Sequence, residues 1–191
     1  MVDTVEIIRS RRSIRRFKSD KIGRDVIEKL LDLATQAPSA KNDQPWKFVV
    51  ATGRAKTSLV NVLMEGMERA EAQGLSTGSM RVSIRAMSEA PVVILVFNRF
   101  GRENLPQEYQ YAKCLVDTQS IGAAIQTFLL AAWDAGLGTL WICDVLYARD
   151  QVQAFVSTKE ELVATIALGV PSESPGKRPR EDLNELTTWM D

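Results

Sequence analysis

Four arginines beside a serine concentrate fixed positive charge near the start of the chain. They are Arg11, Arg12, Arg15 and Arg16, and the serine is Ser13. Guanidinium groups bind phosphate oxygens bidentately and stay charged at any ordinary pH, so the cluster suits a site for an anion such as a phosphate. An exposed basic face or a nucleic-acid-binding tail explains the same residues. The cluster alone leaves the two interpretations equally open.

A second basic group lies far away in the sequence, where Lys177, Arg178 and Arg180 surround Pro179. Proline fixes the backbone here, so the group can complete the same anion site. An exposed basic turn is the alternative, and the motif by itself does not decide between them.

The segment between residues 37 and 46 offers polar groups in a loop that prolines constrain. Its candidate binding residues are Pro38, Ser39, Ala40, Asn42 and Gln44. Side chains and backbone amides in such a loop can form hydrogen bonds with a planar heterocycle. The alternative is a helix stop followed by a turn, because Pro and Asn favour turns without any ligand.

Glycines frame another candidate contact, since Gly136 and Gly138 come just before Leu140, Trp141 and Ile142. Glycine lets the backbone approach a ligand closely, but a plain helix C-cap explains this turn better when it is considered alone. The spacing is not that of a dinucleotide-binding fingerprint, in which the glycines open a helix instead of following one. The P-loop pattern is absent from the sequence as well.

The composition excludes several kinds of chemistry and partner. The 191 residues include no histidine, which excludes His-dependent triads, common zinc sites and imidazole acid–base catalysis. The carboxylates show no metal-ligand spacing, so no metal is expected. Lys and Arg together equal Asp and Glu at 24 each, which disfavours a dedicated nucleic-acid or membrane-surface binder. An enzyme of this composition would rely on an organic cofactor for the difficult step.

The cysteines and the apolar segments favour a cytoplasmic protein. Cys114 and Cys143 lie in apolar surroundings without paired spacing, which predicts buried free thiols in a reducing compartment. The N-terminus lacks the apolar stretch of a signal peptide. The longest apolar segment, residues 121–140, is interrupted by Gln126, Asp134 and glycines, so no membrane span is expected.

The hydrophobic pattern places the candidate residues on one domain of mixed helices and strands. Helices are predicted up to the arginine cluster and over residues 25–37, 115–135 and 150–156, with one or two more between residues 55 and 90. Strands are predicted over residues 47–52, 91–97, 139–144 and 163–168, and the nearly continuous apolar run of residues 91–97 predicts a strand buried on both faces. Residues 99–113 are expected to form an exposed loop and a candidate lid. Residues 171–191 are predicted to form an extended arm. The arm is too apolar to stay in solvent, so we expect it to lie against the domain or a partner subunit.

Taken together and in this order, the motifs resemble the nitroreductase family of FMN-dependent oxidoreductases. The matching segments are residues 11–15, 37–39 with Asn42, 44–46, 135–138, 168–171 and 178–180. Each piece is weak alone, but the ordered set spans almost the whole chain and is specific. The resemblance implies an α+β fold in which a mostly antiparallel sheet is packed between helices. It also implies that residues 1–191 form a single domain in an obligate homodimer, with the 171–191 arm embracing the partner and FMN in the interface.

The resemblance further assigns the candidate residues to cofactor binding and assigns no catalytic residue, because the flavin carries the chemistry. The residues implied around the phosphate and ribityl chain are Arg11, Arg12, Ser13, Arg178 and Arg180, and Arg15 would approach the pyrimidine edge of the ring. The residues implied to reach the flavin from the other subunit are Pro38, Ser39, Ala40, Asn42 and Gln44. The turn formed by Leu140, Trp141 and Ile142 would run beside the isoalloxazine ring.

The implied activity is transfer of reducing equivalents from NAD(P)H to a nitroaromatic, quinone or similar acceptor by a ping-pong route. A nitroreductase-fold enzyme with a different flavin reaction, of the reductive dehalogenase or dehydrogenase type, is the first alternative. A flavin-binding sensor or carrier without turnover is the second. A nucleic-acid-binding module built on the arginine cluster is the remaining rival, and its mark would be binding that weakens steeply with salt.

Overall fold

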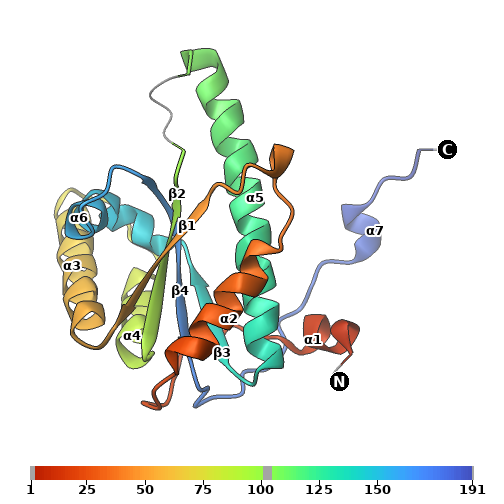
Figure 1. The fold of residues 1–191 in the computed structure, drawn as a ribbon, viewed down its shortest axis with the longest axis horizontal. Coiled ribbons are helices and arrows are strands. Elements are labelled where there is room, and N and C mark those ends of the chain that lie inside the picture. Colours follow the sequence, from red (N-terminus) through yellow and green to blue (C-terminus); the bar gives the residue numbers. More distant parts are fainter. Residues whose placement is uncertain (1–2, 101–104, 191) are drawn as a thin grey trace.

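A four-stranded antiparallel sheet forms the centre of the protein, in the order β1–β2–β4–β3 (Figure 1). The computed structural model describes residues 3–100 and 105–190. The strands are β1 (Trp46–Thr52), β2 (Val92–Asn98), β3 (Gly138–Ile142) and β4 (Glu161–Gly169). All neighbouring strands pair antiparallel. The expected α+β architecture is confirmed, and the four strands lie close to the predicted segments.

Helices cover both faces of this sheet and bury one hydrophobic cluster on each. One face is covered by α2 (Arg24–Thr35) and α5 (Gln107–Asp134). The other is covered by α3 (Gly53–Ala72), α4 (Met80–Glu89), the 3-10 helix η2 (Asp144–Ala148) and α6 (Arg149–Phe155). The sheet is therefore packed between helices, as the resemblance implies.

Strand β2 supplies side chains to both clusters, which explains its almost continuously apolar sequence. Ile94 packs among the residues of α2 and α5, whereas its neighbour Leu95 packs among those of α3 and α4. All seven residues of β2 are buried. A strand covered on both faces has no solvent side on which to place polar residues, and the predicted doubly buried strand is confirmed.

Helix α5 is longer than the sequence predicts, and it corrects the expectation of an exposed loop over residues 99–113. The helix begins at Gln107, directly after Pro106. Its first turns extend beyond the end of the sheet (Figure 1), where Tyr111 is 77% exposed. Because these turns bury little, they carry no apolar periodicity that could reveal the helix. Residues 101–104 of the predicted loop lie outside the described residues, as does Val2 of the predicted first helix.

Among the helices that the structure describes, α5 is also long and apolar enough to cross a membrane, judged by length and composition alone. Its residues Ile121, Ile125 and Phe128 are completely buried in the cluster that α5 shares with α2. The core helix of a soluble domain meets the same criterion, so this property of α5 is weak evidence for a membrane span.

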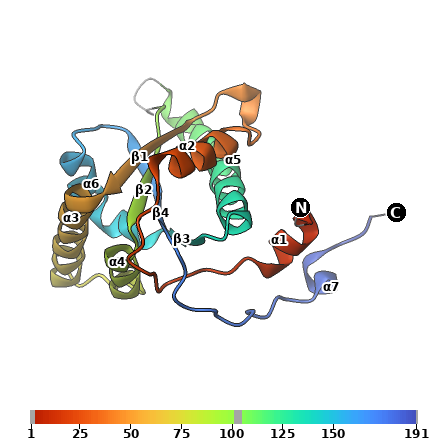
Figure 2. The same ribbon diagram turned by 60° about the horizontal axis from the view of Figure 1, so that its bottom comes forward.

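Both ends of the described chain project from the same side of the domain (Figure 2). Helix α1 (Thr4–Ser10) has no buried residue. The arm leaves the sheet after β4 and contains one helical turn, α7 (Leu183–Leu186), which the prediction of an extended arm misses. Asp182 caps this turn by accepting a hydrogen bond from the Asn184 amide at 2.8 Å. Trp189 is 81% exposed, so one protomer alone does not supply the apolar surface that the arm's composition calls for.

The prediction that both thiols are buried is wrong. Cys143 is exposed and Cys114 is half-buried. Strand β3 ends at Ile142 and η2 begins at Asp144, so Cys143 occupies the turn between them and not the strand predicted over residues 139–144.

Candidate functional site

The arginine cluster follows directly on α1, and two contacts fix its starting point. Trp133 of α5 donates its indole N–H to Ser10 Oγ at 2.9 Å, which ties the end of α1 to the domain. Arg12 Nη1 donates to three carbonyl oxygens of the last turn, those of Arg9, Ser10 and Arg11, at 2.9, 2.6 and 3.0 Å. Helix ends leave such carbonyls without partners, so one end of the Arg12 guanidinium caps α1.

The residues after the first arginines lie along the edge of β3. The Ile14 amide donates to the Thr139 carbonyl at 2.9 Å, and Ser13 forms a parallel bridge with Thr139. Ile14 is buried against Gly138, where an added Cβ would come within 2.8 Å of Ile14 Cγ1. Glycine at this position therefore permits a close approach, as its type suggests, but the chain's own Ile14 makes that approach.

Backbone contacts then bring the arm alongside the arginine cluster. The Ser172 amide donates to the Arg16 carbonyl at 3.0 Å. The Glu173 carboxylate accepts hydrogen bonds from the backbone N–H groups of Arg15 and Arg16. These contacts direct the following residues of the arm toward the cluster, and so the two basic groups of the sequence meet.

A cavity of about 310 Å³ lies between the cluster and the arm. Its lining residues are Ile8, Arg9, Arg11, Arg12, Ser13, Arg15, Pro175, Gly176, Lys177, Arg178 and Arg180. Six of them are arginines and one is a lysine, and no described lining residue is acidic. Burial and the charges of Arg180 and Arg12 lower the pKa of Arg11, although an arginine stays protonated at neutral pH. Seven like charges repel one another, so the cavity favours a bound anion.

The lining of this cavity both extends and limits the predicted arginine site. Arg16 lies outside the lining, because its Nε pairs with Glu89 at 3.0 Å on the surface. Arg9, Pro175 and Gly176 line the cavity as well, and none of them is among the residues expected there. For Arg9 a signal was available, because it is a further arginine only two residues before Arg11.

The open edge of β3 beside this cavity exposes one more set of polar groups. In an antiparallel pair, successive residues direct their backbone groups alternately toward and away from the partner strand. The Thr139 carbonyl faces away from β4, since it accepts the Ile14 amide. The backbone N–H and C=O of Trp141, two residues later, must point the same way, away from β4. The backbone groups of Leu140 and Ile142 point toward β4, and the side chains of these two residues are buried.

The predicted loop residues do not join the arginine cavity within one protomer. The loop of residues 38–44, called here the 38–44 loop, precedes Trp46, which pairs with Asn98 at one end of the sheet. The arginine cluster lies at the other end, where Gly138 pairs with Gly169. The seven residues of β2 separate the two ends by about 20 Å, at roughly 3.3 Å per residue.

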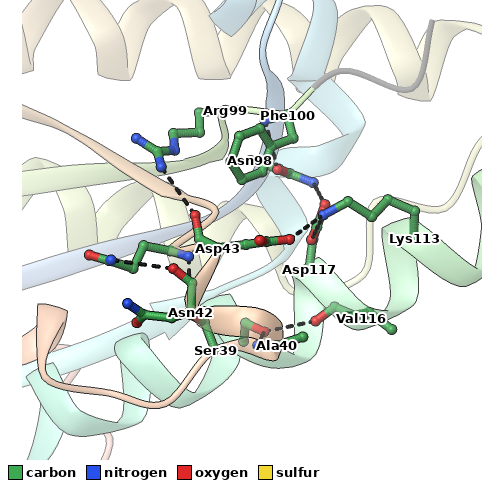
Figure 3. A network of polar contacts seen from close by, with 12 residues as sticks. Ser39, Ala40, Asn42, Asp43, Asn98, Arg99, Phe100, Lys113, Val116 and Asp117 are labelled. Carbon is green, nitrogen blue, oxygen red and sulfur yellow. Dashed lines mark hydrogen bonds and ion pairs between the residues drawn. The ribbon is translucent and has the colours of Figure 1, made fainter. Parts of the chain in front are cut away.

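The backbone of the 38–44 loop is strained. Lys41, Asn42 and Gln44 have φ values of 53, 57 and 49°, in the left-handed region that residues other than glycine seldom adopt. Such conformations persist only where the surroundings enforce them, and they gather at functional sites. Lys113 lies at the centre of a polar network that binds this loop (Figure 3), and no sequence motif predicts that network.

A larger cavity, of about 1140 Å³, lies between α2 and the outer edge of β1. Two of its four basic residues are already bound, because Arg24 pairs with Glu28 at 2.7 Å and Lys56 donates to two carbonyl oxygens at the end of α4. The cavity is also lined by apolar residues, including Val50 on the free edge of the sheet. Its chemistry suits a segment of polypeptide better than an anion, so size alone does not identify the functional site.

The model of the nitroreductase family matches residues 8–170 of this sequence. The chain belongs to the nitroreductase family. Among its relatives, the Bacillus subtilis protein YfhC, named as a candidate NAD(P)H nitroreductase, is 27% identical over 97% of this chain and 93% of its own. The 5,6-dimethylbenzimidazole synthase of Rhodospirillum rubrum is 28% identical over 92% of this chain and 84% of its own. A candidate nitroreductase from Desulfovibrio desulfuricans, solved in complex with FMN, superposes with a TM-score of 0.76 at 27% identity and covers 100% of this chain and 98% of its own.

Proposed function

We propose that this nitroreductase-family protein is an FMN-dependent oxidoreductase that transfers reducing equivalents from NAD(P)H to a nitroaromatic, quinone or similar acceptor. The observation that carries the proposal is the cavity lined by seven cations, none of its described lining residues being acidic, beside an open strand edge. A phosphate monoester carries a charge of about −2 at neutral pH, which such a cavity fits. The names of the Bacillus and Desulfovibrio relatives support the choice of NAD(P)H and FMN.

The proposed phosphate contacts come from both basic groups. Arg11, Arg178 and Arg180 would donate charge-assisted hydrogen bonds to the phosphate, with the Ser13 hydroxyl beside them. Arg12 would contribute less, because its Nη1 already caps α1. Several such bonds suffice to hold a cofactor without a covalent link.

The edge of β3 would hold the ring of the flavin. Of the three implied residues, which all lie in β3, Trp141 is the one whose backbone N–H and C=O face the open edge, so we expect it to hydrogen-bond the ring. Arg15 would lie toward the pyrimidine edge, where a cation stabilises developing negative charge. Bound FMN would supply the hydride-transfer chemistry, and water can complete the proton transfer, so the absence of histidine is no obstacle.

We propose a homodimer, because one protomer supplies only nine of the fourteen implied residues to each flavin, and we place the protein in the cytoplasm. Pro38, Ser39, Ala40, Asn42 and Gln44 lie at the opposite end of the sheet from the arginine cavity, and we propose that they contact the flavin of the second subunit. Residues 181–191 at the end of the arm are acidic, polar or apolar and include no cation, and the larger cavity at the edge of β1 has mostly basic and apolar lining residues. We propose that residues 181–191 of each protomer lie in this cavity of its partner.

The reaction is tested by purifying the protein, recording flavin absorbance, and following NADPH oxidation with a nitroaromatic acceptor. We expect bound flavin and acceptor-dependent oxidation. A colourless protein that FMN cannot reconstitute would contradict the proposal.

The dimer is tested separately by light scattering after deletion of residues 181–191. The shortened chain should be monomeric and should bind FMN more weakly than the full chain. A shortened chain that remains a dimer with full FMN affinity would exclude the proposed role of the arm.

A different flavin reaction on the same fold is a second candidate, because the dimethylbenzimidazole synthase is about as identical to this chain, at 28%, as the nitroreductase candidates are, at 27%. Bound flavin without nicotinamide oxidation would favour it. Flavin that every donor reduces slowly, together with a redox-dependent affinity for a partner, would favour a sensor or carrier.

A further inference from the structure

A carboxylate and an amide are buried at the end of the sheet where the 38–44 loop leaves it. Asp117 of α5 is 2% exposed and Asn98 at the end of β2 is 1% exposed. Asp117 accepts hydrogen bonds from Asn98 Nδ2 at 3.1 Å and from Lys113 Nζ at 2.6 Å. A buried carboxylate is unfavourable unless it is paired and hydrogen-bonded, so Asp117 fixes the position of the Lys113 ammonium.

The same ammonium binds the 38–44 loop. Lys113 Nζ donates to Asp43 Oδ2 at 3.3 Å, so one cation joins a buried carboxylate of α5 to a carboxylate of the loop (Figure 3). Partial burial alone would lower the pKa of Lys113, but its hydrogen bonds and ion pairs with Asp117 and Asp43 outweigh this and raise it. The lysine therefore remains a cation, as both bonds require.

The two residues that follow β2, Arg99 and Phe100, bind the loop from its other side (Figure 3). Arg99 donates its amide to the Pro45 carbonyl at 2.9 Å and its Nη2 to the Asp43 carbonyl at 3.1 Å. The ring of Phe100 lies between two cations, with the Arg99 guanidinium carbon and Lys113 Nζ each 4.9 Å from its centroid. The loop is thus bound through side chain and backbone at Asp43.

This bonding converges on the strained part of the backbone. Asp43 stands between Asn42 and Gln44, which both have positive φ values. Two hydroxyls complete the arrangement, because Ser39 Oγ accepts the Gln44 amide at 3.0 Å and Ser120 Oγ accepts the Ala40 amide at 3.3 Å. Without such bonds a segment of this kind would relax to ordinary backbone angles.

We propose that Asp117, Lys113 and Asp43, called here the Lys113 clamp, are positioning residues that hold the 38–44 loop in the shape needed to contact the flavin of the second subunit. This proposal rests on the role given to the loop under the proposed function. None of the three residues need touch the flavin, since they act through the loop. Stability alone does not explain this network. An apolar cluster of equal volume would stabilise the protein as well as a buried ion pair does, and it would not need a strained, half-exposed loop as a partner.

The test compares Lys113→Met with Lys113→Arg and with Lys47→Met in the full-length protein. Lys47 is the matched control, because its Nζ forms an ion pair with Glu160 at 2.8 Å, and Glu160 lies outside the 38–44 loop and the Lys113 clamp. The first measurement is hydrogen exchange of the amides of residues 40–44 in flavin-free protein. The second is the dissociation constant for FMN from a fluorescence titration, and the third is the urea midpoint of unfolding.

We expect Lys113→Met to exchange the loop amides faster and to weaken FMN binding about tenfold, the loss typical of one charge-assisted hydrogen bond. Lys113→Arg, which keeps a cation between the two carboxylates, should restore most of both properties. Lys47→Met should change neither, even where it lowers the urea midpoint. Should Lys113→Met fail to fold, Asp43→Ala removes the loop's end of the clamp, leaves the Asp117–Lys113 pair intact, and should give the same two effects.

Unchanged exchange of the loop amides in both clamp variants overturns the proposal. So does faster exchange with unchanged FMN affinity, because the clamp would then hold the loop without positioning it for flavin. A wild-type protein that binds no FMN overturns the proposed function itself, whereas wild-type FMN binding that the clamp variants retain in full overturns only this inference.

Discussion

Replacing Arg11 and Arg180 together by alanine should remove most of the affinity for FMN and leave the affinity for riboflavin almost unchanged. Riboflavin lacks the phosphate, so contacts to the ring and the ribityl chain are kept in both titrations. The two arginines come from opposite walls of the cavity, one from the N-terminal cluster and one from the arm. The double variant therefore isolates the phosphate contact.

The expected loss follows from the surroundings of the two side chains. A hydrogen bond to a charged group contributes about 1.5–3 kcal/mol, and the lower end applies to Arg180, which is exposed, while Arg11 is half-buried. Burial and the charge of Arg180 lower the pKa of Arg11, so the two guanidiniums lie close enough to act on the same anion. The double variant should lose about 3–4 kcal/mol, the sum of a smaller loss for Arg180 and a larger one for Arg11. The dissociation constant for FMN should therefore rise roughly 100-fold to 1000-fold.

Fluorescence titration of flavin-free protein with FMN and with riboflavin measures both affinities. Arg16→Ala is the matched control, because it removes the same charge from the same segment but from a side chain paired with Glu89 outside the cavity. Inorganic phosphate offers a second readout without flavin. It should raise the unfolding temperature of wild-type protein and of Arg16→Ala, but not that of the double variant.

Two results would refute this reasoning. FMN bound by the double variant at wild-type affinity would mean that the cavity does not hold the phosphate. An equal loss of FMN affinity in Arg16→Ala would mean that overall charge, and not the geometry of the cavity, governs binding.

Three further changes test the fold around the site. Gly138→Ala should destabilise the protein by about 1–3 kcal/mol in urea unfolding, because the new methyl group overlaps buried Ile14, and an unchanged midpoint would show that Ile14 can move. Phe128→Ala should destabilise it by about 3–5 kcal/mol, since this residue of α5 is completely buried; a much smaller loss would mean that the cluster collapses into the space. Cys143 should react with iodoacetamide more slowly at neutral pH than an unhindered thiol, because partial burial of its sulfur and the charge of Asp144 raise its pKa more than a hydrogen bond with Trp141 lowers it; peptide mapping across pH measures the rate, and a rate equal to that of a model thiol would contradict the shift.

The sequence was sufficient for those features whose signals are local or periodic. The apolar run of residues 92–97 predicted a strand buried on both faces, and β2 is one. The arginine types at the start of the chain and in the arm predicted a shared anion site, and the structure brings both groups to one cavity. An arginine side chain binds anions by its chemical type, so the arginines of the anion site could be proposed before any of their contacts was known.

Features that depend on what a residue packs against could not be predicted from the sequence. The first turns of α5 bury little, so nothing in their pattern distinguished helix from loop. Cys143 is apolar by type and was assigned to the interior, but the end of β3 leaves it in a turn. Asp117 and Lys113 are separated by four residues, a spacing that many exposed helix pairs share, and only the fold reveals that this carboxylate is buried.

The distribution of polar groups along the sheet is the physical argument for a site shared between two chains. One end of the sheet holds a cavity of like charges that favours an anion, with an open strand edge beside it. The other end holds a strained loop with hydrogen-bonded amides, bound by Lys113, which pairs with the buried carboxylate of Asp117. Neither arrangement improves the stability of an isolated protomer, since clustered cations repel and positive φ angles cost conformational energy. In the proposed dimer both would become favourable, because an anionic planar ligand would lie between the cavity of one protomer and the loop of the other, and the exposed α1 and arm, which project from one side of the domain (Figure 2), would be available to the second protomer.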